Sequence, residues 1–233
     1  GRAWSAGMDL TQIGPRSEEG ELDMPKHGQR GKGHPDIRTR LRREMMTART
    51  GGLLLYTKPI IAQVHGYCLA GGSELATGCD LVYVADDATI GYPAVRFGVP
   101  DMHFHPWLMG MRAAMEMMVT GDSVTGVEAV RLGWANAAHP AGDLEAAVLG
   151  VARRICAIPA EVVQMNKRAV HRQMDHMGMR AGIRAGTELC ALGSHTRSLT
   201  DFIASVGEKG LTSALQERDE PFGDYRTEGA QGD

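Results

Sequence analysis

The chain reads KPIIAQVHGYCLAGGSEL from Lys58 to Leu75, and this stretch decides the fold. Its apolar half predicts a strand, and the glycine pair Gly71 and Gly72 predicts the start of a helix. A turn from strand to helix leaves backbone N–H groups unpaired, and the helix dipole adds partial positive charge there. The turn is therefore a candidate site for a developing oxyanion. Glu74 follows Gly71 closely enough to act as an acid or base in the same pocket.

The overall composition indicates a globular protein of ordinary charge. The chain has 233 residues, 43% of them hydrophobic, which suits one domain or one domain with an appendage. The formal net charge of −3 gives no case for binding nucleic acid. No apolar run approaches the roughly 18 residues of a membrane-spanning helix, and the first residues lack the pattern of a secretory signal. We therefore expect a cytoplasmic protein.

The cysteines are scattered along the chain without the close spacing of a metal site. We interpret all four as buried thiols in a reducing compartment, not as disulfide partners or zinc ligands. They are Cys68, Cys79, Cys156 and Cys190.

The first fifty residues predict little regular structure before one helix. Residues 1–10 read as a strand end and a loop, and residues 11–36 read as a loop rich in Gly, Pro and charge. Residues 36–50 have helical composition and spacing. Gly51 and Gly52 end that helix.

The next forty residues predict alternating strands and a helix. Strands are expected over Ile60–Val64, Asp80–Ala85 and Thr89–Tyr92, with a helix from about Gly72 to Gly78 after the first strand. The order strand–helix–strand argues for an α/β unit with parallel pairing.

The remaining chain is expected to be almost entirely helical, with Gly133 as a C-terminal cap and a frayed tail over residues 223–233. The helices are predicted over Trp107–Thr120, Val124–Leu132, 143–157, 159–177 and 179–193.

Three segments together resemble the enoyl-CoA hydratase/isomerase (crotonase) family. The stretch quoted above continues into Cys79–Ala85, Gly1–Leu10 looks like that family's first oxyanion-hole segment, and Thr120–Ala129 with Leu132–Asn136 looks like its downstream helix–turn–helix. The resemblance extends from residue 1 to about residue 175. It implies an α/β fold, a crotonase-like spiral of ββα units with a helical C-terminal region.

The resemblance also implies a division of the chain. A crotonase core is expected over residues 1–142, a helical trimerisation region over 143–222, and a tail over 223–233. The chain begins inside a motif, whereas family members carry several strands and a helix before this point. We therefore expect the native chain to be longer, with the first strands of the core missing here.

The site implied by the resemblance is an oxyanion hole for the thioester carbonyl of an acyl-CoA. By motif position its two donors are the N–H groups of Met8 and Gly71. Two such donors stabilise the enolate-like oxygen most as its charge develops. The residues expected to bind the substrate or its CoA moiety are Arg2, Ala6, Gly7, Leu69 and Gly72.

Glu74 is the expected acid or base. In hydratases that resemble this chain, a glutamate at this place works with a second one in the following loop, after a proline. Here Ala94 follows Pro93, and alanine cannot move a proton. Ordinary two-glutamate hydration is thus put in doubt.

Replacement groups lie shortly after Ala94. Asp101 resembles a catalytic aspartate of other family members, and His103 and His105 are close by in sequence. We take Asp101 and His103 as the further catalytic candidates. No third ligand accompanies the two histidines, so no metal site is predicted. Ser73 does not fit the G-x-S-x-G pattern of a nucleophilic serine, and the sequence assigns it no base.

The expected function is that of an enzyme acting on acyl-CoA thioesters, in fatty acyl-CoA metabolism. It would need no cofactor, because CoA is part of the substrate, and it would assemble as a homotrimer or hexamer without nucleic acid or membrane partners. Two alternatives remain open. One is another reaction of the family, namely isomerisation, dehalogenation, decarboxylation or thioester hydrolysis. The other is a catalytically silent CoA-binding or assembly protein, as Ala94 would allow.

Overall fold

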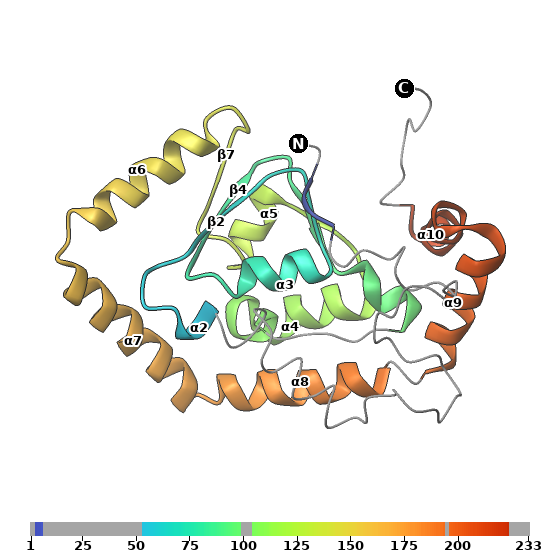
Figure 1. The fold of residues 1–233 in the computed structure, drawn as a ribbon. Coiled ribbons are helices and arrows are strands. Elements are labelled where there is room, and N and C mark those ends of the chain that lie inside the picture. Colours follow the sequence, from blue (N-terminus) through green and yellow to red (C-terminus); the bar gives the residue numbers. More distant parts are fainter. Residues whose placement is uncertain (1–2, 7–52, 99–103, 194–195, 224–233) are drawn as a thin grey trace, which may run out of the picture.

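The computed structural model describes residues 3–6, 53–98, 104–193 and 196–223. Their strands form two sheets, and helices surround them (Figure 1). The first sheet has the order β1 (Ala3–Ser5), β3 (Tyr67–Leu69), β5 (Thr89–Gly91) and β6 (Val124–Thr125). The second has the order β2 (Ile61–Val64), β4 (Leu81–Ala85) and β7 (Ala137–His139).

Parallel pairing dominates both sheets, as the strand–helix–strand order predicted. β2 pairs in parallel with β4, β4 with β7, β1 with β3, and β3 with β5. The β5–β6 pair is antiparallel. The α/β class expected from the sequence is confirmed.

The deciding stretch contains two strands where one was predicted. β2 ends at Val64, and the chain turns at Gly66, whose φ of 58° lies in the left-handed region that glycine tolerates. β3 then begins at Tyr67 in the other sheet. One buried core spans both sheets, because Val64 of β2 and Cys68 of β3 are both fully buried in it.

The central helices follow the strands closely. α2 covers Leu53–Leu55, α3 Gly71–Thr77 and α4 His105–Thr120, and a 3-10 helix, η3, covers Pro93–Phe97. α5 begins at Gly126, later than predicted, because Val124 and Thr125 pair with β5 as strand β6. The Thr125 hydroxyl then caps α5 by accepting a hydrogen bond from the Glu128 N–H.

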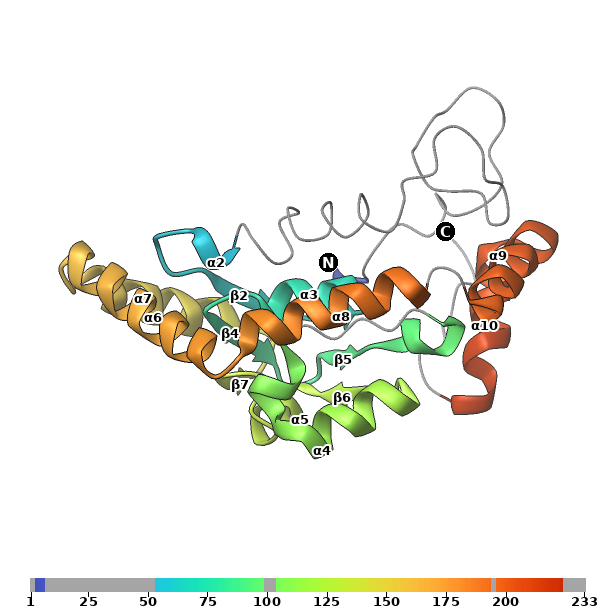
Figure 2. The same cartoon turned by 90° about the horizontal axis from the view of Figure 1, so that it is seen from below.

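The C-terminal helices form an arc around the core (Figures 1 and 2). α6 contacts all three strands of the second sheet, and α8 packs through Met179 and Ile183 against Phe104 at the start of α4. α9 packs on η3, where the Phe97 and Phe202 rings stack with centroids 4.5 Å apart. The helices are α6 (Leu144–Cys156), α7 (Ala160–His176), α8 (Met179–Gly193), α9 (Arg197–Lys209), α10 (Leu211–Asp219) and the 3-10 helix η4 (Glu220–Phe222).

Two charged side chains tie this arc to the core. Asp80, just before β4, accepts hydrogen bonds from the Ile60 N–H and from Lys167 Nζ of α7, both at 2.7 Å. Arg96 of η3 is almost wholly buried and lies 3.1 Å from Asp219 at the end of α10. Its guanidinium also stacks on the Phe222 ring, 3.8 Å from the centroid.

Some sequence predictions need correction or lie outside the described residues. None of the four cysteines forms a disulfide, but Cys156, at the end of α6, is exposed and Cys79 is half-buried, so the prediction that all four are buried is wrong for these two. Strand β7 was not anticipated. The predicted loop over 11–36 and the predicted helix over 36–50 lie outside the described residues, as do residues 224–233 of the tail. Among the described helices, none is both long and apolar enough to cross a membrane.

Candidate active site

The first sheet brings the two predicted donor segments together. β1 and β3 are neighbours, with Ser5 opposite Cys68. Where α3 follows β3, Gly72 lies against Ser5, and a Cβ at Gly72 would come within 2.4 Å of the Ser5 carbonyl oxygen. Only glycine allows so close an approach of the two backbones.

The turn into α3 is strained at Ala70. This residue has φ 48° and ψ −119°, and it is the one non-glycine residue with positive φ in the described part of the chain. Its N–H donates to the Gly91 carbonyl of β5 at 3.0 Å, which holds the turn in place. Gly71 comes next and opens α3, so its N–H belongs to the helix turn whose N–H groups have no acceptor within the helix.

The remaining predicted donor and binding residues are only partly described. Ala6 directly follows Ser5 and is exposed, and Leu69 ends β3 half-buried. Arg2, Gly7 and Met8 lie outside the described residues, and so do Asp101 and His103. Their predicted roles remain predictions.

Glu74 lies on the first turn of α3, and its side chain is fully buried. His105, the first residue of α4, lies beside this carboxylate, with its Nδ1 3.2 Å from Glu74 Oε1. That separation suits an ion pair when the ring is protonated, although the direction from Nδ1 falls outside hydrogen-bond geometry. The other ring nitrogen, Nε2, is within hydrogen-bond distance of Ser73 Oγ at 3.1 Å.

Two neighbouring side chains make further contacts with this cluster. The Thr77 hydroxyl donates to the carbonyl oxygens of Ser73 and Glu74, at 3.0 Å each. The buried Tyr92 ring meets His105 edge to face, with centroids 6.3 Å apart. The sequence singled out Glu74 and considered His105, but the bridge from His105 to Ser73 was missed because the two residues are distant in the chain.

Ala94 lies in an apolar environment. It is buried in η3 within a cluster that includes Phe97, Leu199 and Phe202. A carboxylate there would be buried among aromatic and aliphatic side chains at high cost. Alanine therefore suits this position, and η3 offers Glu74 no carboxylate from residue 94.

Burial makes two thiols near the site poor nucleophiles. Desolvation raises the pKa of Cys68 far above its ordinary value. Desolvation, followed by the charge of Asp80, raises the pKa of Cys79 to about 11. Within the described ranges, no three His, Cys, Asp or Glu side chains converge as metal ligands would.

Comparison with known proteins places this arrangement in a family. The sequence profile of the family described as enoyl-CoA hydratase/isomerase matches residues 23–224. EchA13 of Mycobacterium tuberculosis is 32% identical over 78% of this chain and 60% of its own length. Hydroxycinnamoyl-CoA hydratase-lyase of Pseudomonas fluorescens is 30% identical over 66% of this chain and 53% of its own length. The chain thus spans between half and two thirds of the length of these two relatives.

Solved structures give the same assignment. An enoyl-CoA hydratase from Mycobacterium smegmatis superposes with a TM-score of 0.72 at 32% identity, over 82% of this chain and 62% of that chain. An enoyl-CoA hydratase/isomerase from Xanthobacter autotrophicus superposes with a TM-score of 0.75 at 28% identity, over 95% and 78% of the two chains. Sequence profile, sequence relatives and fold agree, and the chain belongs to the enoyl-CoA hydratase/isomerase family.

Proposed function

We propose that this protein is an enzyme that binds acyl-CoA thioesters and stabilises a thioester enolate in a backbone oxyanion hole, in fatty acyl-CoA metabolism. The observation that carries the proposal is the buried carboxylate of Glu74 on the first turn of α3, directly after the strained turn at Ala70 and Gly71. The printed name of a relative, hydroxycinnamoyl-CoA hydratase-lyase, supports a CoA thioester as the substrate.

In this proposal the thioester carbonyl oxygen accepts hydrogen bonds from the N–H groups of Gly71 and Met8. Glu74 takes a proton from the substrate carbon and returns it, while the two donors stabilise the enolate oxygen in between. Losing one donor of this kind typically costs about 3 to 4 kcal/mol of transition-state stabilisation. The close contact between Gly72 and Ser5 supports this arrangement, because it brings the segment before Met8 next to α3.

The other predicted site residues keep proposed roles. Asp101 and His103 are further candidates for proton transfer, and CoA itself is the only coenzyme we propose. The substrate-binding residues in this proposal are Arg2, Ala6, Gly7, Leu69 and Gly72.

The number of groups that can transfer protons supports isomerisation over hydration as the proposed reaction. Hydration by two carboxylates is disfavoured by Ala94, which lies buried in an apolar cluster. Isomerisation of a double bond needs one base that removes and returns a proton, and Glu74 alone can supply it. Dehalogenation, decarboxylation or thioester hydrolysis, and a silent CoA-binding role, are the remaining alternatives.

We also propose that the chain assembles as a homotrimer or hexamer through its C-terminal helices. The support is α7, which has no buried residue in the single chain and exposes Val162, Met165 and Val170. Large apolar side chains gathered on one surface are typical of an interface.

The test is turnover of crotonyl-CoA and of a 3-enoyl-CoA, followed at the enoyl-thioester absorbance, with wild type and Glu74→Gln. We expect isomerisation by the wild type, lowered about 10²- to 10⁴-fold in Glu74→Gln, because the amide cannot accept the proton. Fast hydration of crotonyl-CoA that depends on Glu74 would show that Ala94 is no obstacle. CoA binding without turnover of any thioester would favour the silent binding protein.

A further inference from the structure

Buried polar side chains are concentrated on α3 and at the start of α4. Six polar or charged residues are buried as whole residues in the part of the chain that the structure describes, and four of them lie here. Burying such groups is costly unless they are paired, so their gathering at one place calls for a common role. The four are Ser73, Glu74, Thr77 and His105.

The His105 ring lies between the side chains of Ser73 and Glu74, and all three residues are fully buried. Nε2 is 3.1 Å from Ser73 Oγ, and Nδ1 is 3.2 Å from Glu74 Oε1. Ser73 and Glu74 are adjacent on α3, whereas His105 comes from α4. The bridge is therefore a tertiary contact, made where the first turns of two helices meet.

We propose that His105, held by Ser73, is a charge partner of Glu74 in a chain where Ala94 supplies no second carboxylate. The proposal rests on the proposed function, in which Glu74 is the base. A carboxylate buried alone would favour its neutral form and lose its basicity. An imidazolium next to it makes the buried pair neutral overall and keeps Glu74 ionised and ready to accept a proton.

The pair also balances the charge of the reaction. When Glu74 accepts a proton from the substrate carbon, the electron pair of the broken C–H bond forms the enolate, and the Glu74–His105 pair gains one positive charge. The return of the proton to carbon restores both to neutrality. His105 acts on the substrate only through Glu74, so it is a positioning residue.

Ser73 suits the ring in either protonation state. A hydroxyl is both a donor and an acceptor, so Ser73 can accept a hydrogen bond from Nε2–H of the charged ring or donate one to Nε2 of the neutral ring. A buried alanine in its place would leave Nε2 without this partner. The hydroxyl can therefore keep Nε2 hydrogen-bonded whether or not this nitrogen carries a proton.

Steady-state kinetics of His105→Asn and Ser73→Ala in the full chain test the proposal. On the 3-enoyl-CoA turned over by the wild type, we expect kcat to fall about 10²-fold or more in His105→Asn, with KM within about twofold. Ser73→Ala is expected to lower kcat less, because the ring remains. Thr187→Val is the matched control for loss of a buried hydroxyl, since Thr187 donates to the Ile183 carbonyl within α8, and its kcat should equal that of the wild type.

A second measurement does not depend on turnover. The ring nitrogen signals of His105 in ¹⁵N NMR, identified by their loss in His105→Asn, should move in Glu74→Gln while those of His139 stay in place. A wild type without activity but with this response would refute the proposed function and support the pairing. An unchanged kcat in His105→Asn, or His105 signals indifferent to Glu74→Gln, would refute the pairing. An acyl group found on Ser73 by mass spectrometry would also overturn it, because Ser73 would then be a nucleophile.

Discussion

Gly72 lies where two backbone segments from distant parts of the chain touch. Ser5, at the end of β1, approaches it so closely that any side chain would meet the Ser5 carbonyl oxygen. The contact holds the end of β1 against the first turn of α3, on which Glu74 lies. A single absent side chain therefore sets the distance between the two segments that we propose to form the oxyanion hole.

We predict that Gly72→Ala destabilises the protein and disables the site. The added Cβ would come within 2.4 Å of the Ser5 carbonyl oxygen, and overpacking of this kind typically costs about 1 to 3 kcal/mol. Chemical denaturation gives the loss of stability, and turnover of the 3-enoyl-CoA gives the loss of activity.

The matched control is Gly150→Ala in α6. A Cβ at Gly150 would meet nothing within 4 Å, so alanine should leave activity unchanged and stabilise the helix by up to about 1 kcal/mol. A Gly72→Ala variant as stable and active as the wild type would show that β1 can move away without consequence.

At the scale of elements, α5 shows how a short helix is fixed by its first turn. The Thr125 N–H and hydroxyl both donate to Glu128 Oε2, at 2.9 and 3.1 Å, while the Glu128 N–H donates to the Thr125 hydroxyl. This reciprocal cap ends strand β6 and starts α5 at one residue. The hydrogen bonds from Thr125, with the backbone bond as the larger cause, lower the pKa of Glu128.

We predict that the stabilising effect of Glu128 disappears in acid. Because its pKa is lowered in the folded protein, the carboxylate stabilises the fold above the ordinary glutamate pKa of about 4.3. The effect is lost as the pH falls through the lowered value. The free energies of unfolding of wild type and Glu128→Gln, measured by chemical denaturation, should therefore differ at pH 7 and become equal in acid.

Thr125→Ala separates the backbone hydrogen bond of the cap from the two that involve the Thr125 hydroxyl. This variant keeps the backbone donor and loses the hydroxyl, and we expect it to cost about 1 kcal/mol at pH 7. If the difference in free energy of unfolding between wild type and Glu128→Gln stayed constant with pH, this would contradict the role of the carboxylate in the cap.

Helices and strands could be predicted where the pattern that indicates them lies within the segment itself. The apolar run of β2, the helical spacing of α6 to α8 and the glycines at the start of α3 are read from neighbouring residues, and the structure confirms them. Strand β7 has the sequence AAH and becomes a strand because β4 lies beside it. The sequence of that segment carries no sign of its partner.

The site shows the same division. Glu74 was found from its distance to Gly71 along the chain. The approach of His105 to Ser73 depends on where α4 begins relative to α3, and nothing in either segment encodes that position alone. Ala94 was recognised as a departure from the family pattern, but its apolar surroundings came from Leu199 and Phe202 of α9, far along the chain.

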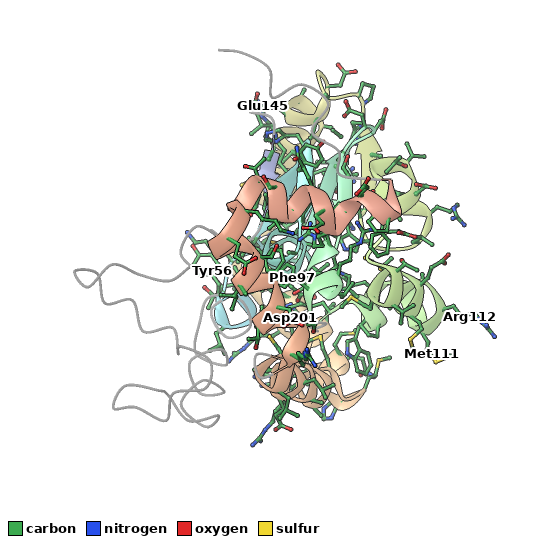
Figure 3. All side chains as sticks on the ribbon, turned by 90° about the vertical axis from the view of Figure 1, so that its right-hand side faces the viewer. Tyr56, Phe97, Met111, Arg112, Glu145 and Asp201 are labelled. Carbon is green, nitrogen blue, oxygen red and sulfur yellow. The ribbon has the colours of Figure 1, made fainter. Side chains whose placement is uncertain are left out.

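At the scale of the whole molecule, both the arc of C-terminal helices and α4 leave large apolar side chains exposed. α7 contributes no buried residue, and on α4 the side chains of Met111 and Arg112 point away from the core (Figure 3). These two residues line a shallow pocket on the surface of α4, together with Met115, Glu116 and Val119. This pocket is separate from the exposed surface of α7.

We predict that a charge on α7 dissociates the assembly. Sedimentation of the wild type should give a mass of three or six chains, and Val170→Glu, at a position that is 62% exposed, should lower it towards one chain. Val127→Glu on α5, at a position that is 57% exposed, should leave the mass unchanged. A monomeric wild type, or equal masses for the two variants, would refute assembly through α7.

The parallel pairing of the strands has a consequence for how the protein acquires its structure in time. Ala3 pairs with Tyr67, and Tyr83 pairs with Ala137, so neither pair can form through a short hairpin. Each must close a long loop first, whereas the helices of the arc form from local contacts within microseconds. During synthesis β1 therefore cannot pair with β3 until the chain has grown past Leu69. A chaperone that shields exposed strand edges should accordingly raise the yield of refolding.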